Sequence, residues 1–200
     1  MPSPLEAIST YFHAKDGNRP FLMRHAFARD ARLEMVVKTD AISFPSTANG
    51  LPELEEILVR RFATAFENVY TFGLRQPTPS DQHRFTCPWL VAMSARSDGA
   101  LRVGSGLYDW QFSTDARCLV ERLVITIDVM EVLPARELAS IMGWITALPY
   151  PWCRPGEVVQ DMPRLEKLAP VERYLKDHFF LDLVSILPWR LICAFLGGST

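Results

Sequence analysis

The sequence predicts an α+β fold in which a curved antiparallel sheet wraps around N-terminal helices, followed by a helical C-terminal extension. Three observations indicate this class. Apart from one short strand, apolar residues recur at helical spacing through residue 66, and at every second residue from 69 to 133. Helical spacing then returns after Pro134. Because long strands bend, we expect the sheet to form an open cone whose mouth is a ligand pocket.

The N-terminal part predicts three helices and one strand. Leu5, Ile8 and Phe12 share one helical face, and Ser3-Pro4 precedes them as an N-cap and first-turn proline. Helical spacing and local composition predict the elements that follow: a helix over 19–27, a strand over 33–37, a loop over 45–50 and a helix over 51–66.

Period-two alternation predicts four long strands in the middle of the chain, over residues 69–75, 83–96, 101–114 and 118–133. Asp98-Gly99 between two alternating runs is a strong signal for a hairpin. Gly104 and Gly106 within one strand predict the bend or bulge that curls the sheet.

The C-terminal part divides the chain into a domain over residues 1–152 and an extension over 153–200. A helix over 134–147 leads to a proline-rich linker, and a further helix over 170–183 leads to an apolar stretch that ends near Leu196. Asp182, Pro188 and Arg190 interrupt this stretch, so we do not expect a membrane span. Three interpretations of the extension stay open: a strap on the domain, an interfacial membrane helix, or an addition without function.

Composition excludes several classes of protein. A net charge of -2 argues against a nucleic-acid protein with a basic surface, and 48% hydrophobic residues argue against disorder. Scattered cysteines and the lack of a secretory signal favour the cytoplasm. No metal-ligand spacing, phosphate loop or nucleophile elbow occurs, so we expect no metal and no cofactor.

The element order, together with three segments, resembles the nuclear transport factor 2-like superfamily in its SnoaL-like branch. The segments are 27–33 before the first strand, 50–57 at the start of the third helix, and 103–112 in a late strand. The resemblance covers about residues 5–152. It implies a cone-shaped barrel that dimerises through its sheet, so a homodimer is expected. It implies no single activity, because the superfamily contains isomerases, dehydratases, cyclases and non-catalytic binders.

Asp40 is the candidate general base. The resemblance implies this role, because isomerase-type members place their base in this region, ahead of the glycine that introduces the helix. A desolvated carboxylate at a cone mouth can abstract a proton next to a carbonyl. No proline follows Asp40, in contrast to the isomerase pattern, and Lys38-Thr39-Asp40 also fits an ordinary polar turn.

His83 and Tyr108 are the candidate electrophilic partners in catalysis. The candidate ligand-binding residues are His25, Trp89, Asp109 and Trp110. Tyr108 offers a hydroxyl to a carbonyl oxygen, and the tryptophans form an apolar pocket floor. Packing in a core or at a dimer interface is the favoured alternative for these aromatic residues.

Asp109 continues an apolar face of its strand, so it needs a partner or a function. Candidate partners are Arg84, His83 or a tyrosine hydroxyl. An ion pair or hydrogen bond that holds two strands is the favoured interpretation.

Three functional hypotheses follow, in this order. The first is a domain that binds a small apolar or aromatic carbonyl compound in the cone. The second is a cofactor-independent isomerase or dehydratase with Asp40 as base. The third is a dimeric interaction module without an open pocket. Binding ranks ahead of catalysis because no acid–base pair can be assigned from the sequence.

Overall fold

The computed structural model describes residues 3–186, with side chains through His178. Helix α1 (Pro4–Asp16) begins at Ser3, whose hydroxyl accepts a hydrogen bond from the Glu6 amide at 3.3 Å. The expected second helix is a short 3₁₀ helix, η1 (Pro20–His25), because the chain is already extended from Phe27 onward.

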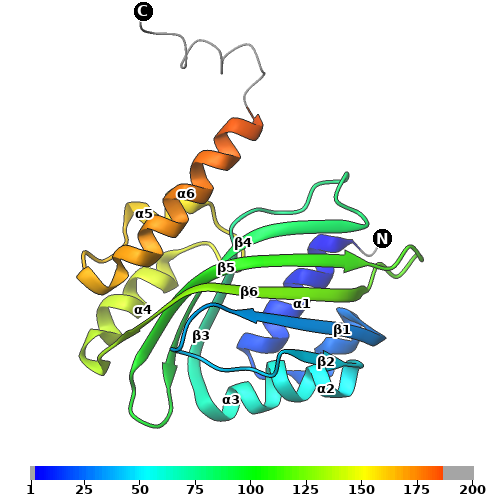
Figure 1. Cartoon of the computed structure of the whole chain (residues 1–200), viewed down its shortest axis with the longest axis horizontal. Helices are drawn as coiled ribbons and strands as arrows, with labels where there is room; N and C mark the ends of the chain where they lie inside the picture. The colour runs from blue at the N-terminus through cyan, green and yellow to red at the C-terminus, as the bar shows by residue number, and fades with distance from the viewer. Residues whose placement is uncertain (1–2, 187–200) are drawn as a thin grey trace, which may run out of the picture.

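A mixed sheet of six strands forms the centre of the molecule (Figure 1). Its spatial order is β2-β1-β6-β5-β4-β3, and all neighbours are antiparallel except β1 and β6. The strands are β1 (Phe27–Val37), β2 (Thr47–Asn49), β3 (Phe66–Gly73), β4 (Arg84–Ala95), β5 (Leu101–Phe112) and β6 (Val120–Leu133). The four predicted long strands are confirmed. Strand β2 falls within the expected loop, because three residues are too few to show a period.

Glycine permits two local features of this frame. Gly50 has a φ of 83° at the start of the third helical run, a conformation that other residues rarely adopt. That run comprises α2 (Leu51–Glu55), the π-helical turn η2 (Glu56–Arg60) and α3 (Arg61–Ala65). The predicted bulge is confirmed beside Gly106, where the register of β5 with β6 shifts. A Cβ atom at Gly106 would collide with the carbonyl oxygen of Thr126.

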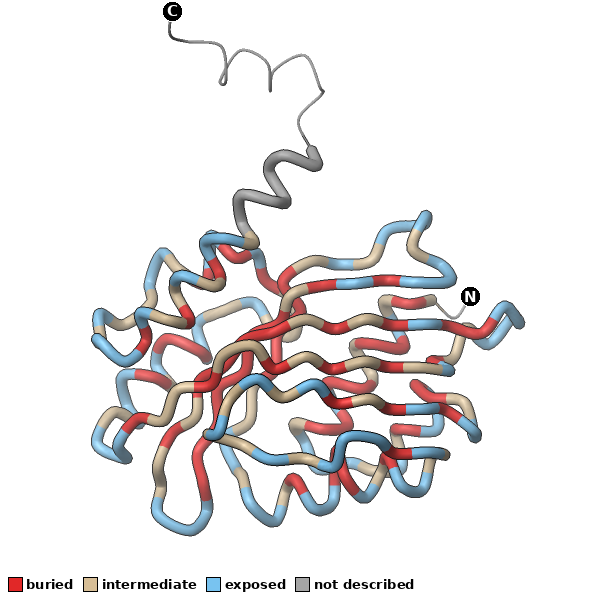
Figure 2. Tube along the Cα trace, in the orientation of Figure 1, coloured by how far each residue is buried: buried red, intermediate tan, exposed pale blue. Residues whose placement is uncertain are grey.

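The two faces of the sheet bury two separate clusters of side chains, and burial alternates along the strands (Figure 2). We call the face that packs against α1 and α2 the inner face. Strand β5 contributes Tyr108 and Trp110 to the inner cluster, and Leu101 and Val103 to the cluster on the outer face. The sheet therefore has a core on each side, and the inner one holds most of the aromatic residues.

The C-terminal helices complete the outer cluster (Figure 1). They are η3 (Ala135–Glu137), α4 (Leu138–Ala147), α5 (Pro155–Gln160), η4 (Glu166–Leu168) and α6 (Ala169–Ile186). Val158, Val171 and Leu175 are fully buried there, so residues 158–175 pack with the outer-face residues of the sheet, which fits the strap interpretation. Helix α5 lies in the segment expected to be linker. Within residues 3–186, no helix is long and apolar enough to cross a membrane. The expected apolar stretch after Ile186 lies outside the described residues.

Candidate functional site

A small cavity lies inside the cone, between α1 and the inner face of the sheet. Its volume is about 40 Å³, where roughly 10–15 Å³ is enough to hold one water molecule. Most of its walls are apolar, from Met35, Ile42, Phe44, Leu58, Phe62, Val91, Met93, Ile125, Ile127 and Met130. The four described lining residues with nitrogen or oxygen in the side chain are Tyr11, Lys15, Trp89 and Tyr108.

Within residues 3–186, two of these polar groups are buried donors that make no hydrogen bond of good geometry. They are the Tyr11 hydroxyl and Trp89 Nε1. The Tyr11 and Tyr108 hydroxyls are close enough to affect each other's pKa, yet the Tyr11 hydroxyl makes no hydrogen bond of good geometry. Burial raises the pKa of both tyrosines well above its usual value, so both hydroxyls stay neutral and keep their protons.

Aromatic contacts hold Tyr11 in place. Its ring meets Phe27 and Trp110 edge to face, with centroids 5.6 and 5.5 Å apart. Trp110 also packs against Tyr108 at 5.1 Å, and its Nε1 is a further buried donor without a partner. Trp110 does not line the cavity, so it supports the site from behind.

A buried polar network adjoins the cavity at Lys15. The side chains of Lys15 and Asp16 are only 9% and 5% exposed, and Lys15 Nζ donates to Asp16 Oδ1 at 3.0 Å. Lys15 also donates to Thr71 Oγ1 at 2.8 Å, and Asp16 Oδ2 accepts from the Thr71 amide at 2.6 Å and the Tyr150 hydroxyl at 3.1 Å. Such an ion pair is stable in the interior because other hydrogen bonds satisfy both charges.

A larger groove opens on the outside of the cavity. Its volume is about 560 Å³, and it shares Ile42, Phe44 and Phe62 with the cavity wall. These three side chains therefore separate the two spaces. The remaining groove residues are Asp40, Ala41, Ser43, Pro45, Ile57, Arg61, Ala65, Phe66 and Arg102.

Comparison with known proteins identifies the fold. No protein-family model and no curated protein matches the sequence. Among solved structures, a nuclear transport factor 2-like superfamily protein from Salmonella enterica aligns with a TM-score of 0.50 at 13% identity, over 62% of this chain and 88% of that one. The chain has the nuclear transport factor 2-like fold.

Two further solved structures share this fold and are described with ligands. A Mycobacterium tuberculosis protein in complex with estradiol-17β-hemisuccinate has a TM-score of 0.50 at 11% identity, over 62% of this chain and 92% of that one. A computationally designed 17-OHP binder has a TM-score of 0.50 at 14% identity, over 65% of this chain and 98% of that one. At these identities the likeness concerns the fold alone.

Within the nuclear transport factor 2-like fold, the residues singled out from the sequence lie at the cavity, at the outer groove, or away from both. Trp89 and Tyr108 line the cavity, and Trp110 packs directly behind them. Asp40 is exposed on the outer groove and does not line the cavity. His83 is exposed at the start of β4.

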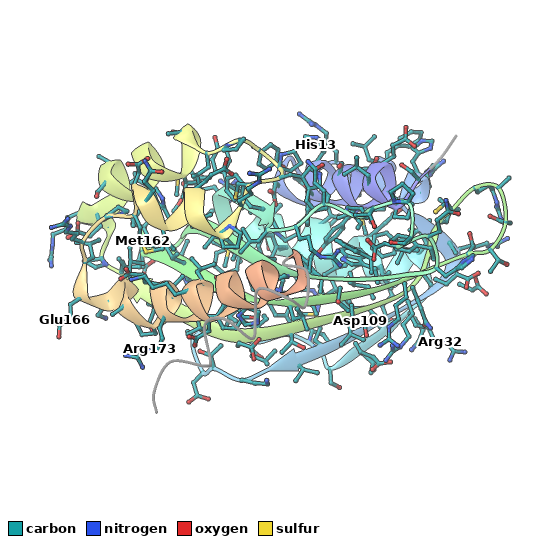
Figure 3. All side chains as sticks on the ribbon, turned by 90° about the horizontal axis from the view of Figure 1, so that it is seen from above. His13, Arg32, Asp109, Met162, Glu166 and Arg173 are labelled. Carbon is teal, nitrogen blue, oxygen red and sulfur yellow. The ribbon has the colours of Figure 1, made fainter. Side chains whose placement is uncertain are left out.

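The other two candidates also lie away from the cavity. His25 is exposed at the end of η1, where its ring contacts Phe21. Asp109 lies on the side of the sheet away from α1 (Figure 3). It accepts two hydrogen bonds from Arg84, at 3.0 and 2.6 Å, so the expected partner Arg84 is confirmed.

The residues of the site that were not predicted include Tyr11, Lys15 and Arg102. Tyr11 lies beside the apolar helical stripe, where it has the appearance of a core residue. From the sequence, Lys15 resembles a solvated charge in the last turn of a helix, and Arg102 resembles a solvated charge on a strand. Tertiary packing brings them to the site, of α1 against β3 for Lys15 and of β5 against the segment after β1 for Arg102.

Proposed function

We propose that the chain binds a small apolar or aromatic carbonyl compound in the inner cavity. The observation that carries the proposal is the pair of buried donors, Tyr11 Oη and Trp89 Nε1, in otherwise apolar walls. Buried donors without a partner are rare in folded proteins, and each costs about 1–3 kcal/mol. A carbonyl oxygen has two lone pairs and accepts such donors without bringing a charge into the cavity.

The ligand would extend from the cavity into the outer groove. About 40 Å³ holds only water-sized guests, so an aromatic compound has to displace Ile42, Phe44 or Phe62. Ile42 and Phe44 lie in the irregular segment between β1 and β2, so their movement would disrupt no helix or long strand. The steroid ester bound by the Mycobacterium tuberculosis protein supports an elongated apolar ligand for this fold.

A matched pair of compounds tests the proposal. We expect 2-acetylnaphthalene to bind more tightly than 2-ethylnaphthalene, which has nearly the same shape and no acceptor. Titration followed by tryptophan fluorescence or calorimetry measures both affinities. Tyr11→Phe should weaken binding of the ketone by about 3- to 10-fold, as for the loss of one hydrogen bond, and leave the hydrocarbon unaffected.

Tyr174→Phe is the control, because Tyr174 donates its hydroxyl to Asp128 in a contact outside the cavity. It should change neither affinity. Equal binding of the two compounds to the unmodified protein, or an equal loss of both in Tyr11→Phe, would contradict the proposal.

Catalysis with Asp40 as general base ranks second, because none of the described cavity-lining residues is a carboxylate or a histidine. The hypothesis requires a substrate whose reacting carbon lies in the groove beside Asp40. Asp40→Asn should then leave ligand affinity intact and abolish proton exchange at that carbon, measured by deuterium incorporation. The homodimer, the interaction module and the cytoplasmic location stay predictions. Light scattering coupled to size exclusion measures the first.

A further inference from the structure

Arg102 lies at the junction of the outer groove with the sheet. It comes from β5, between the outer-face residues Leu101 and Val103, so its side chain belongs to the inner face. Its Nε donates a long hydrogen bond of 3.3 Å to the Ala41 carbonyl, and its guanidinium lies 5.1 Å from the centre of the Phe66 ring. Both contacts hold the group in place without neutralising it.

The guanidinium has no ionic partner within the described part of the chain. No carboxylate lies within 4.0 Å of it, whereas Arg84, Arg96 and Arg122 each pair with an acid at 2.6 to 2.9 Å. Its Nη1 is buried and makes no hydrogen bond. A buried donor on a charged group is more costly to leave unpaired than a neutral donor. Of the donors on residues that line the groove, Arg102 Nη1 would therefore gain most from a bound acceptor.

The other charges of the groove leave it positive. Its described lining residues include two cations, Arg61 and Arg102, and one acid, Asp40. Arg61 pairs only loosely, with Glu56 at 3.8 Å, and both of these side chains are exposed. The residues that line the groove thus include one more cation than acid, in a chain whose net charge is -2.

We propose that Arg102 forms a subsite for a carboxylate on the ligand, so that the natural ligand is an apolar organic acid. Its apolar body enters the inner cavity, and its carboxylate pairs with the Arg102 guanidinium at the wall of the groove. One excess positive charge suits a monoanion, and Asp40 opposes a group of higher charge. This inference rests on the proposed function, because the apolar body has to occupy the cavity.

The test compares 2-acetylnaphthalene with derivatives that carry a carboxylate on the far ring. The carboxylate is attached directly, or through one or two methylene groups, so that one member of the series reaches Arg102. We expect the best acid to bind about tenfold more tightly than the neutral ketone, as for a charge-assisted hydrogen bond. This advantage should shrink as the salt concentration rises.

Arg102→Gln should remove the preference for the acid while retaining affinity for the neutral ketone, because glutamine still donates to the Ala41 carbonyl. Arg102→Lys should keep part of the preference. Arg122→Gln is the matched control, because Arg122 pairs with Glu34 on the outer face and lines neither the groove nor the cavity. It should change neither affinity.

Two results would overturn the inference and leave the proposed function standing. One is that no acid of the series binds more tightly than the ketone. The other is that Arg102→Gln weakens acid and ketone equally, since Arg102 would then only support the Ala41 segment. If the unmodified protein binds neither the ketone nor the acids, the proposed function fails, and the inference fails with it.

Discussion

Each face of the sheet buries a tryptophan to a similar extent, but the two indole N–H groups differ in their hydrogen bonding. Trp89 on the inner face is 3% exposed, and Trp144 of α4 on the outer face is 5% exposed. Trp144 Nε1 donates to the Val158 carbonyl at 3.0 Å, whereas Trp89 Nε1 has no partner. The same side chain is therefore satisfied within the chain on one face and unsatisfied beside the cavity on the other.

This difference indicates which face is closed by the chain itself. On the outer face, α5 supplies the acceptor for Trp144, and α6 supplies the Tyr174 hydroxyl that binds Asp128. Among the described outer-face residues of β5, Ser105 has a buried hydroxyl oxygen that makes no hydrogen bond. On the inner face, the atoms without partners gather in and around the cavity and its groove. The inner face is therefore where the described part of the chain leaves most of its buried polar atoms without a partner.

The largest effect on stability is expected for the buried Lys15–Asp16 ion pair on the inner face. Lys15→Met leaves Asp16 charged and almost fully buried without its cation, so it should lower the free energy of unfolding by about 3–5 kcal/mol. Urea unfolding measures the change. Adding Asp16→Asn should restore part of the stability, because no charge is then buried. A small loss in Lys15→Met would show that solvent reaches this network.

The matched tryptophan variants test the comparison directly. Trp144→Phe removes ring volume and leaves the Val158 carbonyl unpaired, whereas Trp89→Phe removes ring volume alone. The loss of stability should therefore be larger for Trp144→Phe, by about 1–3 kcal/mol. Chemical unfolding of both variants measures the difference. Equal losses would mean that Trp89 Nε1 has a partner in solution, such as an ordered water.

A smaller effect is expected from the tyrosines. Tyr11→Phe removes a buried hydroxyl whose contact with the Tyr108 hydroxyl has poor hydrogen-bond geometry, so stability should change by less than about 1 kcal/mol. Tyr150→Phe removes a hydrogen bond to the buried Asp16 carboxylate and should be destabilising. Thermal unfolding without ligand distinguishes the two. A clear loss in Tyr11→Phe would place its hydroxyl in a structural network.

The smallest effect concerns an exposed ion pair of the outer face. Arg122 donates to both carboxylate oxygens of Glu34, at 2.9 and 3.0 Å, and this hydrogen bonding lowers the pKa of Glu34 below 4.5. The pair therefore stabilises the fold above that pH, and its contribution disappears as the pH falls through the lowered pKa. Because the pair is exposed, Glu34→Gln should cost less than about 1 kcal/mol near neutral pH. Unfolding at pH 7 and at a series of increasingly acidic pH values measures this; a cost that stays constant throughout would contradict it.

Local features of the fold could be read from the sequence because they depend on neighbouring residues. The helix from Ser3, the four long strands and the bulge beside Gly106 follow from apolar spacing and from residues with restricted or unusual backbone freedom. The Arg84–Asp109 pair could be predicted because the two residues lie on adjacent strands of one hairpin, on the same face. The parallel pairing of β1 with β6 is nonlocal, and no turn specifies it.

The tertiary structure alone decided where the candidate site lies. Lys15 reaches Thr71 across 56 positions of sequence, and Arg102 reaches Ala41 across 61. Those contacts depend on how tightly the sheet curves around α1, which is set by the sum of many packing contacts. Spacing along the chain indicates which face a residue occupies, but only packing determines whether a buried donor finds an acceptor. For the buried atoms of Tyr11, Trp89 and Arg102, residues 3–186 supply no acceptor in good hydrogen-bond geometry.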